Sequence, residues 1–259
     1  MALKDEIGVI AWFSLMTTNT EKSNDYYTKL MGWELSDFAV GDDTVKIYSA
    51  AGAPFGNPVP LDGNDIPTHW IAYFSVEDVD ASCAKASELG GAVCVEPFDL
   101  PTVGRTAVVT DPAGAAFHLF TPENKEQPVN VVSGKPGQVC WLEMMVDDPE
   151  AAKAFYGGLL GWDVEDSEME GITYLIGKVG EAMVAGIMKR PDDVPPTPPA
   201  WLPYFMVESL ATSSAKAQEL GAQKLMGPMQ ISMGSFSLFQ DPAGGVAYLF
   251  EGADESAQG

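Results

Sequence analysis

The chain has 259 residues, of which 46% are hydrophobic, enough apolar material for one large or two ordinary folded domains. Its 37 acidic residues outnumber its 14 basic ones and give a formal net charge of -23. A surface this negative repels phosphate backbones and anionic lipid headgroups, which excludes nucleic-acid binding and membrane binding as the main role.

The cysteines and the N-terminus indicate the compartment. Cys83, Cys94 and Cys140 form no CxxC pair and leave an odd cysteine over, which fits a reducing environment. The N-terminal segment lacks the uncharged core of a signal peptide, and no stretch is as long and apolar as a transmembrane span. We therefore expect a cytoplasmic protein.

The first half of the chain predicts strands alternating with helices. A strand over residues 9–16 precedes a helix that starts at a capping box of Thr18 and Glu21, runs to Leu30 and stops at Gly32. A short strand follows over 44–49, and the Pro-rich residues 51–67 are predicted to connect two modules. A strand over 70–76 and a helix capped by Asp78 come next. Strands over 107–110 and 117–120 flank a DPAG turn.

The second half repeats this order. Residues 8–33 match residues 137–162 at an offset of 129, and residues 70–90 match 201–221 with twelve identities in 21 positions. Helix starts are predicted at Asp148, with Pro149 next to it, and at Ser209. Further strands are predicted over 172–177, 183–188, 236–239 and 246–250, with a second DPAG turn before the last. The chain is therefore a tandem duplication with four modules.

The order of these motifs resembles the vicinal oxygen chelate superfamily, which includes glyoxalase I, bleomycin-resistance proteins and extradiol dioxygenases. The motifs are a strand, a helix with an aromatic pair before a Gly-Trp stop, a second strand and helix, and a DPAG turn before the last strand. The chain is most similar to the two-domain, glyoxalase-like subgroup. The resemblance implies an α+β fold of two domains, each with two βαβββ modules whose curved mixed sheets form a cup.

The duplication and the resemblance together define the expected domains. We place the first domain at residues 1–122, a linker at 123–136, the second domain at 137–252 and a C-terminal tail at 253–259. Because four modules are already present in one chain, we expect a monomer that binds a small molecule in a cup.

The resemblance also implies a divalent metal, held by His, Gln or Glu side chains from the first and last strands of each module. Trp12 and Trp141 stand at the first-strand positions, and Ile71 and Leu202 open the second modules; none of these side chains can bind a metal. The last-strand positions of the first modules fall near residues 47–49 and 184–186, without a suitable donor.

The closing strands place His118 and Tyr248 at the remaining ligand positions. His69 lies two residues before Ile71, so it shares a face with the ligand position of that strand. These two histidines are the only candidates for a metal site, and the sequence offers no third donor near them. A role for either histidine in lining a pocket or in hydrogen bonding within the core is the alternative. We therefore assign no cofactor, with a divalent metal as the alternative.

Other residues are candidates for ligand binding or catalysis. An inward Arg105 would clamp an anionic group of a ligand, whereas an outward one would pair with an acid. Trp12 and Trp141 either stack on a planar ligand or fill the cup. Glu143 shares the face of Trp141 and is the candidate general base, with an ordinary ion pair as the alternative.

These observations predict a binding protein of the bleomycin-resistance type that works without the metal of the family. The ligand-binding candidates are Trp12, His69, Arg105, His118, Trp141 and Tyr248. The alternatives are a metal-dependent glyoxalase-like lyase or isomerase and an extradiol dioxygenase, each acting on a small oxygenated metabolite.

Overall fold

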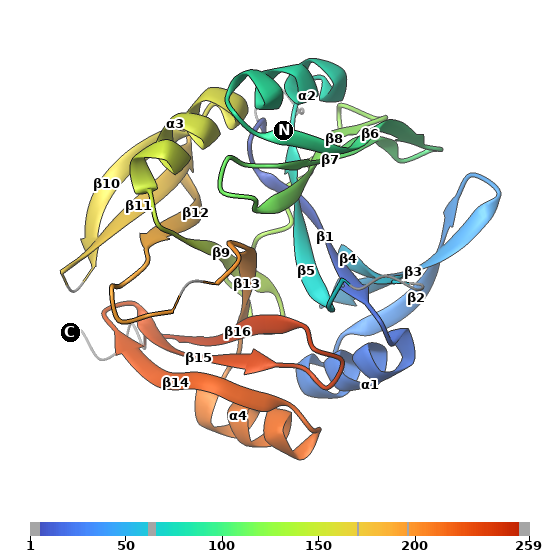
Figure 1. Ribbon diagram of the computed structural model, residues 1–259. Helices are drawn as coiled ribbons and strands as arrows, with labels where there is room; N and C mark the ends of the chain where they lie inside the picture. Colours follow the sequence, from blue (N-terminus) through green and yellow to red (C-terminus); the bar gives the residue numbers. More distant parts are fainter. Residues whose placement is uncertain (1–5, 62–65, 170, 196, 254–259) are drawn as a thin grey trace.

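Two eight-stranded sheets, one from each half of the chain, form the molecule (Figure 1). The computed structural model describes residues 6–61, 66–169, 171–195 and 197–253, so residues 254–259 of the predicted tail lie outside it. None of the helices in these described ranges combines the length and the apolar character needed to cross a bilayer.

Sheet A contains the strands of the first half in the order β2-β3-β4-β1-β5-β8-β7-β6. Its elements are β1 (Ile10–Thr17), α1 (Thr20–Met31), β2 (Glu34–Val40), β3 (Asp43–Ala50), β4 (Ala53–Pro60), β5 (His69–Ser75), α2 (Val79–Glu88), β6 (Ala92–Leu100), β7 (Gly104–Thr110) and β8 (Ala116–Pro122).

Sheet B repeats this arrangement in the order β10-β11-β12-β9-β13-β16-β15-β14. Its elements are β9 (Val139–Val146), α3 (Pro149–Leu160), β10 (Asp163–Met169), β11 (Ile172–Val179), β12 (Ala182–Lys189), β13 (Trp201–Met206), α4 (Leu210–Glu219), β14 (Gln223–Ile231), β15 (Gly234–Gln240) and β16 (Val246–Gly252). The predicted α+β fold with four βαβββ modules is confirmed.

The first and last strands of each module lie together at the centre of the sheet. In sheet A, β1 pairs with β4 and β5 pairs with β8 in parallel, while β1 and β5 pair in an antiparallel ladder. Sheet B has the same pairings among β9, β12, β13 and β16. The two sheets curl away from each other, so their concave faces open on opposite sides of the molecule (Figure 1).

Strand β4 corrects the prediction that residues 51–67 only connect two modules. Four prolines made this segment read as a linker, because proline has no N–H to give to a ladder. The register of β3 against β4 ends at Gly56, so the rest of β4 has a neighbour on one side only, β1. The Leu61 N–H donates to Thr17 O. Strand alternation then turns the nitrogens of Pro58 and Pro60 toward the unpaired side.

The predicted helix starts are confirmed at three of the four helices. The side chains of Asp78, Asp148 and Ser209 accept hydrogen bonds from backbone N–H groups three residues ahead. At α1 the prediction of Thr18 was wrong, because the side chain of Asn19 caps the helix by accepting from Lys22 N. Asparagine ranks above threonine as an N-cap, but the capping-box spacing of Thr18 and Glu21 favoured the neighbouring residue.

The two halves share one hydrophobic core between the convex faces of the sheets. Phe74 of β5 packs against both Trp162 and Trp201, with ring centroids 5.4 and 5.7 Å away. α1 lies beside α4 and α2 beside α3 (Figure 1). The core therefore belongs to the whole chain and not to either half alone.

Reciprocal hydrogen bonds cross this core. Trp33 Nε1 donates to Gly137 O at 2.6 Å, and Trp162 Nε1 donates to Gly8 O at 2.7 Å. Both bonds join residues that are identical between the halves, so they reproduce one contact about a pseudo-twofold axis. The Gly-Trp stop of each helix thus holds the partner half.

The first DPAG turn also contacts the other half. Asp111 Oδ1 accepts from the N–H groups of Ala113 and Ala115, which closes the turn. Its other oxygen accepts from the Tyr156 hydroxyl at 3.0 Å, and Trp201 Nε1 donates to the same hydroxyl. The turn that separates β7 from β8 is therefore also part of the contact between the halves.

Candidate binding site on the concave faces

The concave face of sheet B collects aromatic side chains around one carboxylate. Alternation along β9 buries Leu142 and Met144 in the core and turns Trp141 and Glu143 to the concave face. Cross-strand partners share a face, and Trp141 is opposite Tyr204, which is opposite Tyr248. The concave face of sheet B is thus lined by side chains from β9, β13 and β16.

Glu143 is the centre of a hydrogen-bond network. The Tyr174 hydroxyl donates to its Oε2 at 2.8 Å and the Tyr204 hydroxyl donates to its Oε1 at 2.9 Å. Trp141 Nε1 in turn donates to the Tyr174 hydroxyl at 2.9 Å. One carboxylate oxygen is therefore held by a phenol from β13, the neighbour of β9, and the other by a phenol from β11, two strands away on the other side.

The environment of Glu143 disfavours its charge. Burial raises the pKa of its carboxyl, and the hydrogen bonds from Tyr174 and Tyr204 act in the opposite direction. Burial, followed by the negative charge of Glu143, raises the pKa values of Tyr174, Tyr204 and Tyr248 far above their ordinary range. The tyrosines are therefore neutral hydrogen-bond donors.

Gly186 of β12 makes room for this network. It pairs with Glu143 in the register of β12 and β9, on the concave face. A Cβ at this position would overlap the Tyr174 hydroxyl and lie 3.0 Å from Trp141 Nε1. The Tyr174 ring can approach Glu143 only because residue 186 has no side chain.

The walls of this face are aromatic and apolar. The rings of Tyr204 and Tyr248 stack with their centroids 4.0 Å apart, and Phe236 meets both rings edge-on. Register places Met226 opposite Leu238 and Met229 opposite Phe236, so both methionines extend the same face. The arrangement suits a flat, largely apolar ligand with one polar group.

The concave face of sheet A has equivalent positions with different chemistry. Trp12 Nε1 donates to Asn57 Oδ1 at 2.8 Å, and the Ser14 hydroxyl donates to the same oxygen at 2.7 Å. Because the Ser14 hydrogen is used in that bond, the Tyr73 hydroxyl, 3.1 Å away, donates to Ser14 Oγ. Ser14 stands where Glu143 stands in sheet B, and Asn57 stands where Gly186 stands.

His118 lies on the concave face of sheet A, and its hydrogen bonds define which ring nitrogen carries the proton. Thr106 Oγ1 donates to Leu119 O, so it accepts from His118 Nδ1 at 3.0 Å, which leaves Nε2 without the proton. The imidazole stacks on the Tyr73 ring at 3.9 Å. Burial lowers the pKa of His118 to about 3, so the ring is neutral at physiological pH.

The donors present do not fit the metal of the family. His69 lies at the start of β5. His118 of β8 lies opposite Tyr73, which is four residues, or about 13 Å, further along β5 than His69. The two histidines therefore cannot share one ion. Sheet A offers one imidazole and sheet B one carboxylate, and within the described ranges no three His, Cys, Asp or Glu side chains cluster closely enough for a metal.

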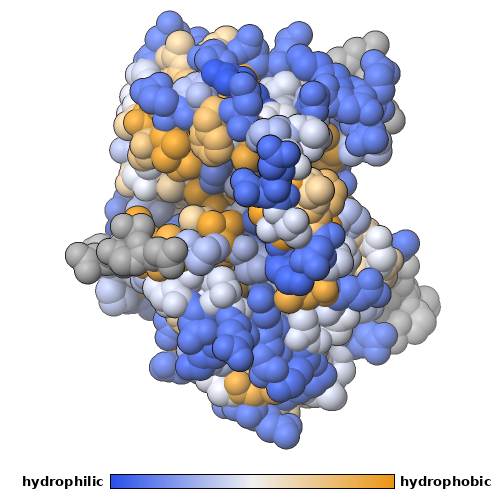
Figure 2. Space-filling model, turned by 90° about the vertical axis from the view of Figure 1, so that its right-hand side faces the viewer, coloured by the Kyte–Doolittle hydropathy of each residue, from blue (hydrophilic) through white to orange (hydrophobic). Residues whose placement is uncertain are grey.

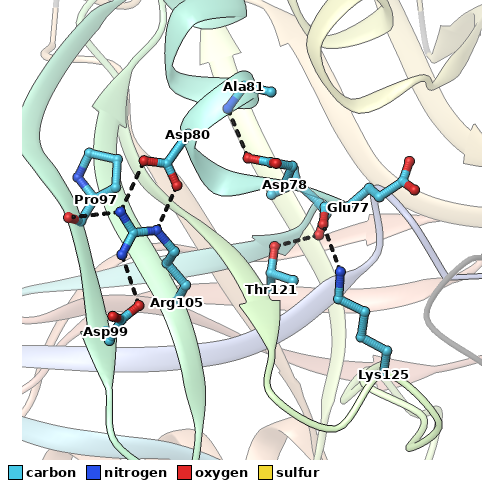
Figure 3. Close-up of polar contacts among 10 residues, drawn as sticks. Glu77, Asp78, Asp80, Ala81, Pro97, Asp99, Arg105, Thr121 and Lys125 are labelled. Atoms are coloured by element: carbon cyan, nitrogen blue, oxygen red, sulfur yellow. Dashed lines mark hydrogen bonds and ion pairs between the residues drawn. The ribbon is translucent and has the colours of Figure 1, made fainter.

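Arg105 lies on the helix side of sheet A and not on the concave face (Figure 3). Its guanidinium donates to Asp80 of α2 at 2.6 Å and to Asp99 of β6 at 2.8 Å. Its neighbour Thr106 faces the cup, so alternation turns Arg105 away from it. The ion pair that was the alternative to ligand binding is the arrangement in the structure.

A cavity of about 350 Å³ lies at the junction of the halves. It is lined by the first DPAG turn, the start of α3 and the ends of β9 and β12, including an ion pair between Arg190 and Asp147.

Figure 2 looks onto the side that carries β2, β3 and β6 and shows apolar surface in a recess there. Exposed apolar side chains of these strands are Phe38, Val95 and Phe98.

Sequence reasoning found part of each network and missed the other members. Glu143 and Trp141 were identified from alternation along one strand, whereas Tyr174 and Tyr204 come from strands 31 and 61 residues away. Asn57 was missed because its segment was taken for a linker. The signal available for Tyr204 was its match to Tyr73 in the repeat, at the same distance from the strand tryptophan.

Comparisons with known proteins agree with this architecture. The family model described as glyoxalase/bleomycin resistance protein/dioxygenase superfamily matches residues 9–119 and 138–247. CFP32 of Mycobacterium tuberculosis, whose name places it among the glyoxylases, is 31% identical over 96% of both chains. The anthracycline biosynthesis protein DnrV of Streptomyces peucetius is 32% identical over 97% of both chains.

Solved structures share the fold at low sequence identity. The Mn(II)-bound glyoxalase from Novosphingobium aromaticivorans aligns with a TM-score of 0.64 at 18% identity, over 95% of this chain and 82% of its own. Homoprotocatechuate 2,3-dioxygenase from Arthrobacter globiformis aligns with a TM-score of 0.65 at 17% identity, over 95% of this chain and 80% of its own.

Proposed function

This chain belongs to the glyoxalase/bleomycin resistance protein/dioxygenase superfamily, and from that premise we propose that it binds a small organic molecule on the concave face of sheet B, without the metal. The single observation that carries the proposal is the network of Glu143 with Tyr174 and Tyr204. A carboxylate placed at the centre of an aromatic face is a specific polar group in an apolar site, as in ligand pockets generally.

The donor set supports a site that works without the metal. A divalent metal site of this superfamily needs imidazole and carboxylate donors that converge from several strands. At the equivalent central positions sheet B carries Trp141, Glu143 and Tyr248, and both oxygens of Glu143 already accept hydrogen bonds from phenols. The remaining side chains are suited to stacking and hydrogen bonding.

The relatives support a planar ligand. DnrV and DauV, two Streptomyces relatives, are named for anthracycline biosynthesis, which concerns polycyclic aromatic compounds. The partly exposed indole of Trp141 offers a flat surface for such a ring system, next to the buried stack of Tyr204 and Tyr248. We therefore extend the proposal to a planar ligand several rings in size.

A fluorescence titration with 1,4-dihydroxyanthraquinone, combined with elemental analysis of the purified protein, tests this function. We expect saturable quenching of tryptophan fluorescence that Trp141→Leu removes and Trp12→Leu, the matched change in sheet A, retains. Metal content well below one ion per chain is expected as well. Stoichiometric metal, or quenching that depends on Trp12 instead of Trp141, would contradict the proposal.

A second candidate is a lyase or isomerase reaction with Glu143 as general base. It is favoured by the raised pKa of this carboxyl, because a base acts best when its pKa is near the working pH. In this candidate the carboxylate removes a proton from a carbon next to a carbonyl of the bound ligand. Exchange of that proton for deuterium in heavy water, lost in Glu143→Gln, distinguishes it from binding alone.

We also propose that the protein acts as a monomer in the cytoplasm. Each half already packs against the other half, through the shared core and the reciprocal hydrogen bonds of Trp33 and Trp162. Sedimentation equilibrium is expected to give the mass of one chain, 27.6 kDa.

A further inference from the structure

Glu143 faces the cup without a basic partner among the described residues. The ion pairs of the described residues all involve other acids, and the groups acting on the pKa of Glu143 are burial and two phenols. Lys178, two residues beyond Ile176 on β11, is paired with Glu165 at 2.6 Å. The negative charge of Glu143 is therefore hydrogen-bonded but not neutralised.

The hydrogen bonds leave acceptor capacity on Glu143. Each carboxylate oxygen has two lone pairs, and each accepts one phenol hydroxyl. The phenols donate to the carboxylate, so their hydrogens are not available to a ligand. A ligand that meets this centre must donate hydrogen bonds, and a positively charged donor gains most from a partly buried carboxylate.

The walls next to Glu143 also favour a cation. Trp141, Tyr204 and Tyr248 surround the carboxylate on the same face of sheet B. Aromatic faces attract ammonium groups within about 6 Å, by about 0.5 to 2 kcal/mol depending on desolvation. The net charge of -23 raises the local concentration of cations around the molecule.

The rim of this face is rich in methionine. Register places Met145 opposite Met188, and Met226 and Met229 opposite Leu238 and Phe236, all on the concave face. Met226 and Met229 are 38% and 46% exposed, so apolar surface remains to be covered. Methionine adapts its shape to apolar ligands and makes favourable contacts with aromatic rings.

We propose that the concave face of sheet B takes an organic cation, an amine carried on a planar apolar body. The ammonium group donates to the open lone pairs of Glu143, and the planar body lies between the aromatic rings and the methionine rim. This inference rests on the proposed function, because it names the ligand class of the same site.

Three probes with the same naphthalene ring test the ligand class in the unmodified protein. They are 2-naphthylmethylamine, a cation at pH 7, the neutral 2-naphthalenemethanol and the anion 2-naphthoate. Titration calorimetry is performed at about 0.3 M salt, where interactions with the protein surface are screened. We expect the amine to bind roughly tenfold or more tightly than the alcohol, which is at least about 1.4 kcal/mol, and the anion to bind most weakly.

Two charge variants locate the effect. Glu143→Gln is expected to lower the affinity for the amine roughly tenfold and to leave the affinity for the alcohol unchanged. Glu219→Gln removes the same charge from the exposed end of α4, on the opposite side of sheet B, and is expected to change neither. Circular dichroism checks that both variants fold.

The outcomes separate this inference from the proposed function. Equal affinities for amine and alcohol, or an amine preference that survives in folded Glu143→Gln, would overturn the cation inference alone. Binding of 1,4-dihydroxyanthraquinone without binding of the amine would also overturn the cation inference alone. If neither that compound nor any naphthalene probe binds, both proposals are wrong. The comparison of probes uses the unmodified chain, so a variant that fails to fold does not remove the test.

Discussion

Single residues decide the difference between the two concave faces. Ser14 and Glu143 occupy equivalent positions, as do Asn57 and Gly186, while both faces keep the strand tryptophan. In sheet A the indole donates to the Asn57 amide oxygen, and in sheet B it donates to a tyrosine hydroxyl. The same scaffold therefore presents neutral groups on one side and a carboxylate on the other.

Glu143 should make the stability of the protein depend on pH. Its pKa in the folded protein is raised by burial above the ordinary value of 4.5, so the protonated form stabilises the fold and ionisation opposes it. Relative to Glu143→Gln, the unmodified protein should lose stability as the pH rises from about 4.5 through the raised pKa. The loss is about 1.4 kcal/mol per pH unit between the two pKa values.

Chemical denaturation of both proteins between about pH 4 and pH 9 measures this difference. The glutamine variant does not titrate at residue 143, so the contributions of the other carboxyl groups cancel in the comparison. The difference should level off above the raised pKa. A constant difference across this range would mean that Glu143 is solvated like a surface carboxyl.

How far sequence reasoning reaches at this scale depends on the separation of the partners. Alternation on one strand placed Glu143 beside Trp141 on one face, and the structure has them there. The hydroxyls that hold Glu143 come from β11 and β13, whose register relative to β9 no local pattern specifies. For the same reason Arg105 was undecided until the structure placed it beside Asp80.

Elements were predicted well where one face is buried and poorly where both faces are exposed or prolines interrupt. All four helices and the central strands other than β4 were found, because their apolar residues recur with the period of the element. The edge strands β2, β6, β10 and β14 were missed. Most side chains of β2 and β6 are exposed on both faces of the strand, so these strands carry little alternation.

The approach of the Tyr174 side chain across β12 to Glu143 depends on Gly186. We expect Gly186→Ala to displace the Tyr174 hydroxyl, break its bond to Glu143 and destabilise the protein by about 1 to 3 kcal/mol through the unsatisfied polar groups. Ligand affinity should fall as well. Denaturation curves and the fluorescence titration measure the two effects.

Gly134→Ala is the matched control for that substitution. A Cβ at Gly134 meets no atom within 4 Å, and the residue lies in the exposed connection between the halves. Its stability and affinity should stay within about 0.5 kcal/mol of the unmodified protein. Equal behaviour of the two alanine variants would show that Tyr174 relaxes without cost.

The whole molecule is held together by contacts that cross between the halves. Fluorescence-detected denaturation of Trp33→Phe and Trp162→Phe tests this. Each variant keeps an aromatic ring in the core but leaves the partly buried Gly137 carbonyl or the buried Gly8 carbonyl without its donor, at a cost of about 1 to 3 kcal/mol. Because the bonds are equivalent, the two costs should agree within about 1 kcal/mol.

Both variants should still unfold in one transition, because the core is shared by the two sheets. Two transitions, with only one of them moved by each substitution, would mean that the halves are separate folding units. In that case residues 1–122 and 137–252, the domains expected from the sequence, would also unfold independently.

The reciprocal tryptophan bonds also bear on how such a chain arose. A single half with one glycine and one tryptophan at these positions could make both bonds with a second copy of itself, as the subunits of a twofold dimer would. Because both halves belong to one chain, their cups do not have to be identical. The interface residues Gly8 and Gly137, Trp33 and Trp162 have stayed the same, whereas Ser14 and Glu143 have diverged at the centre of the cups.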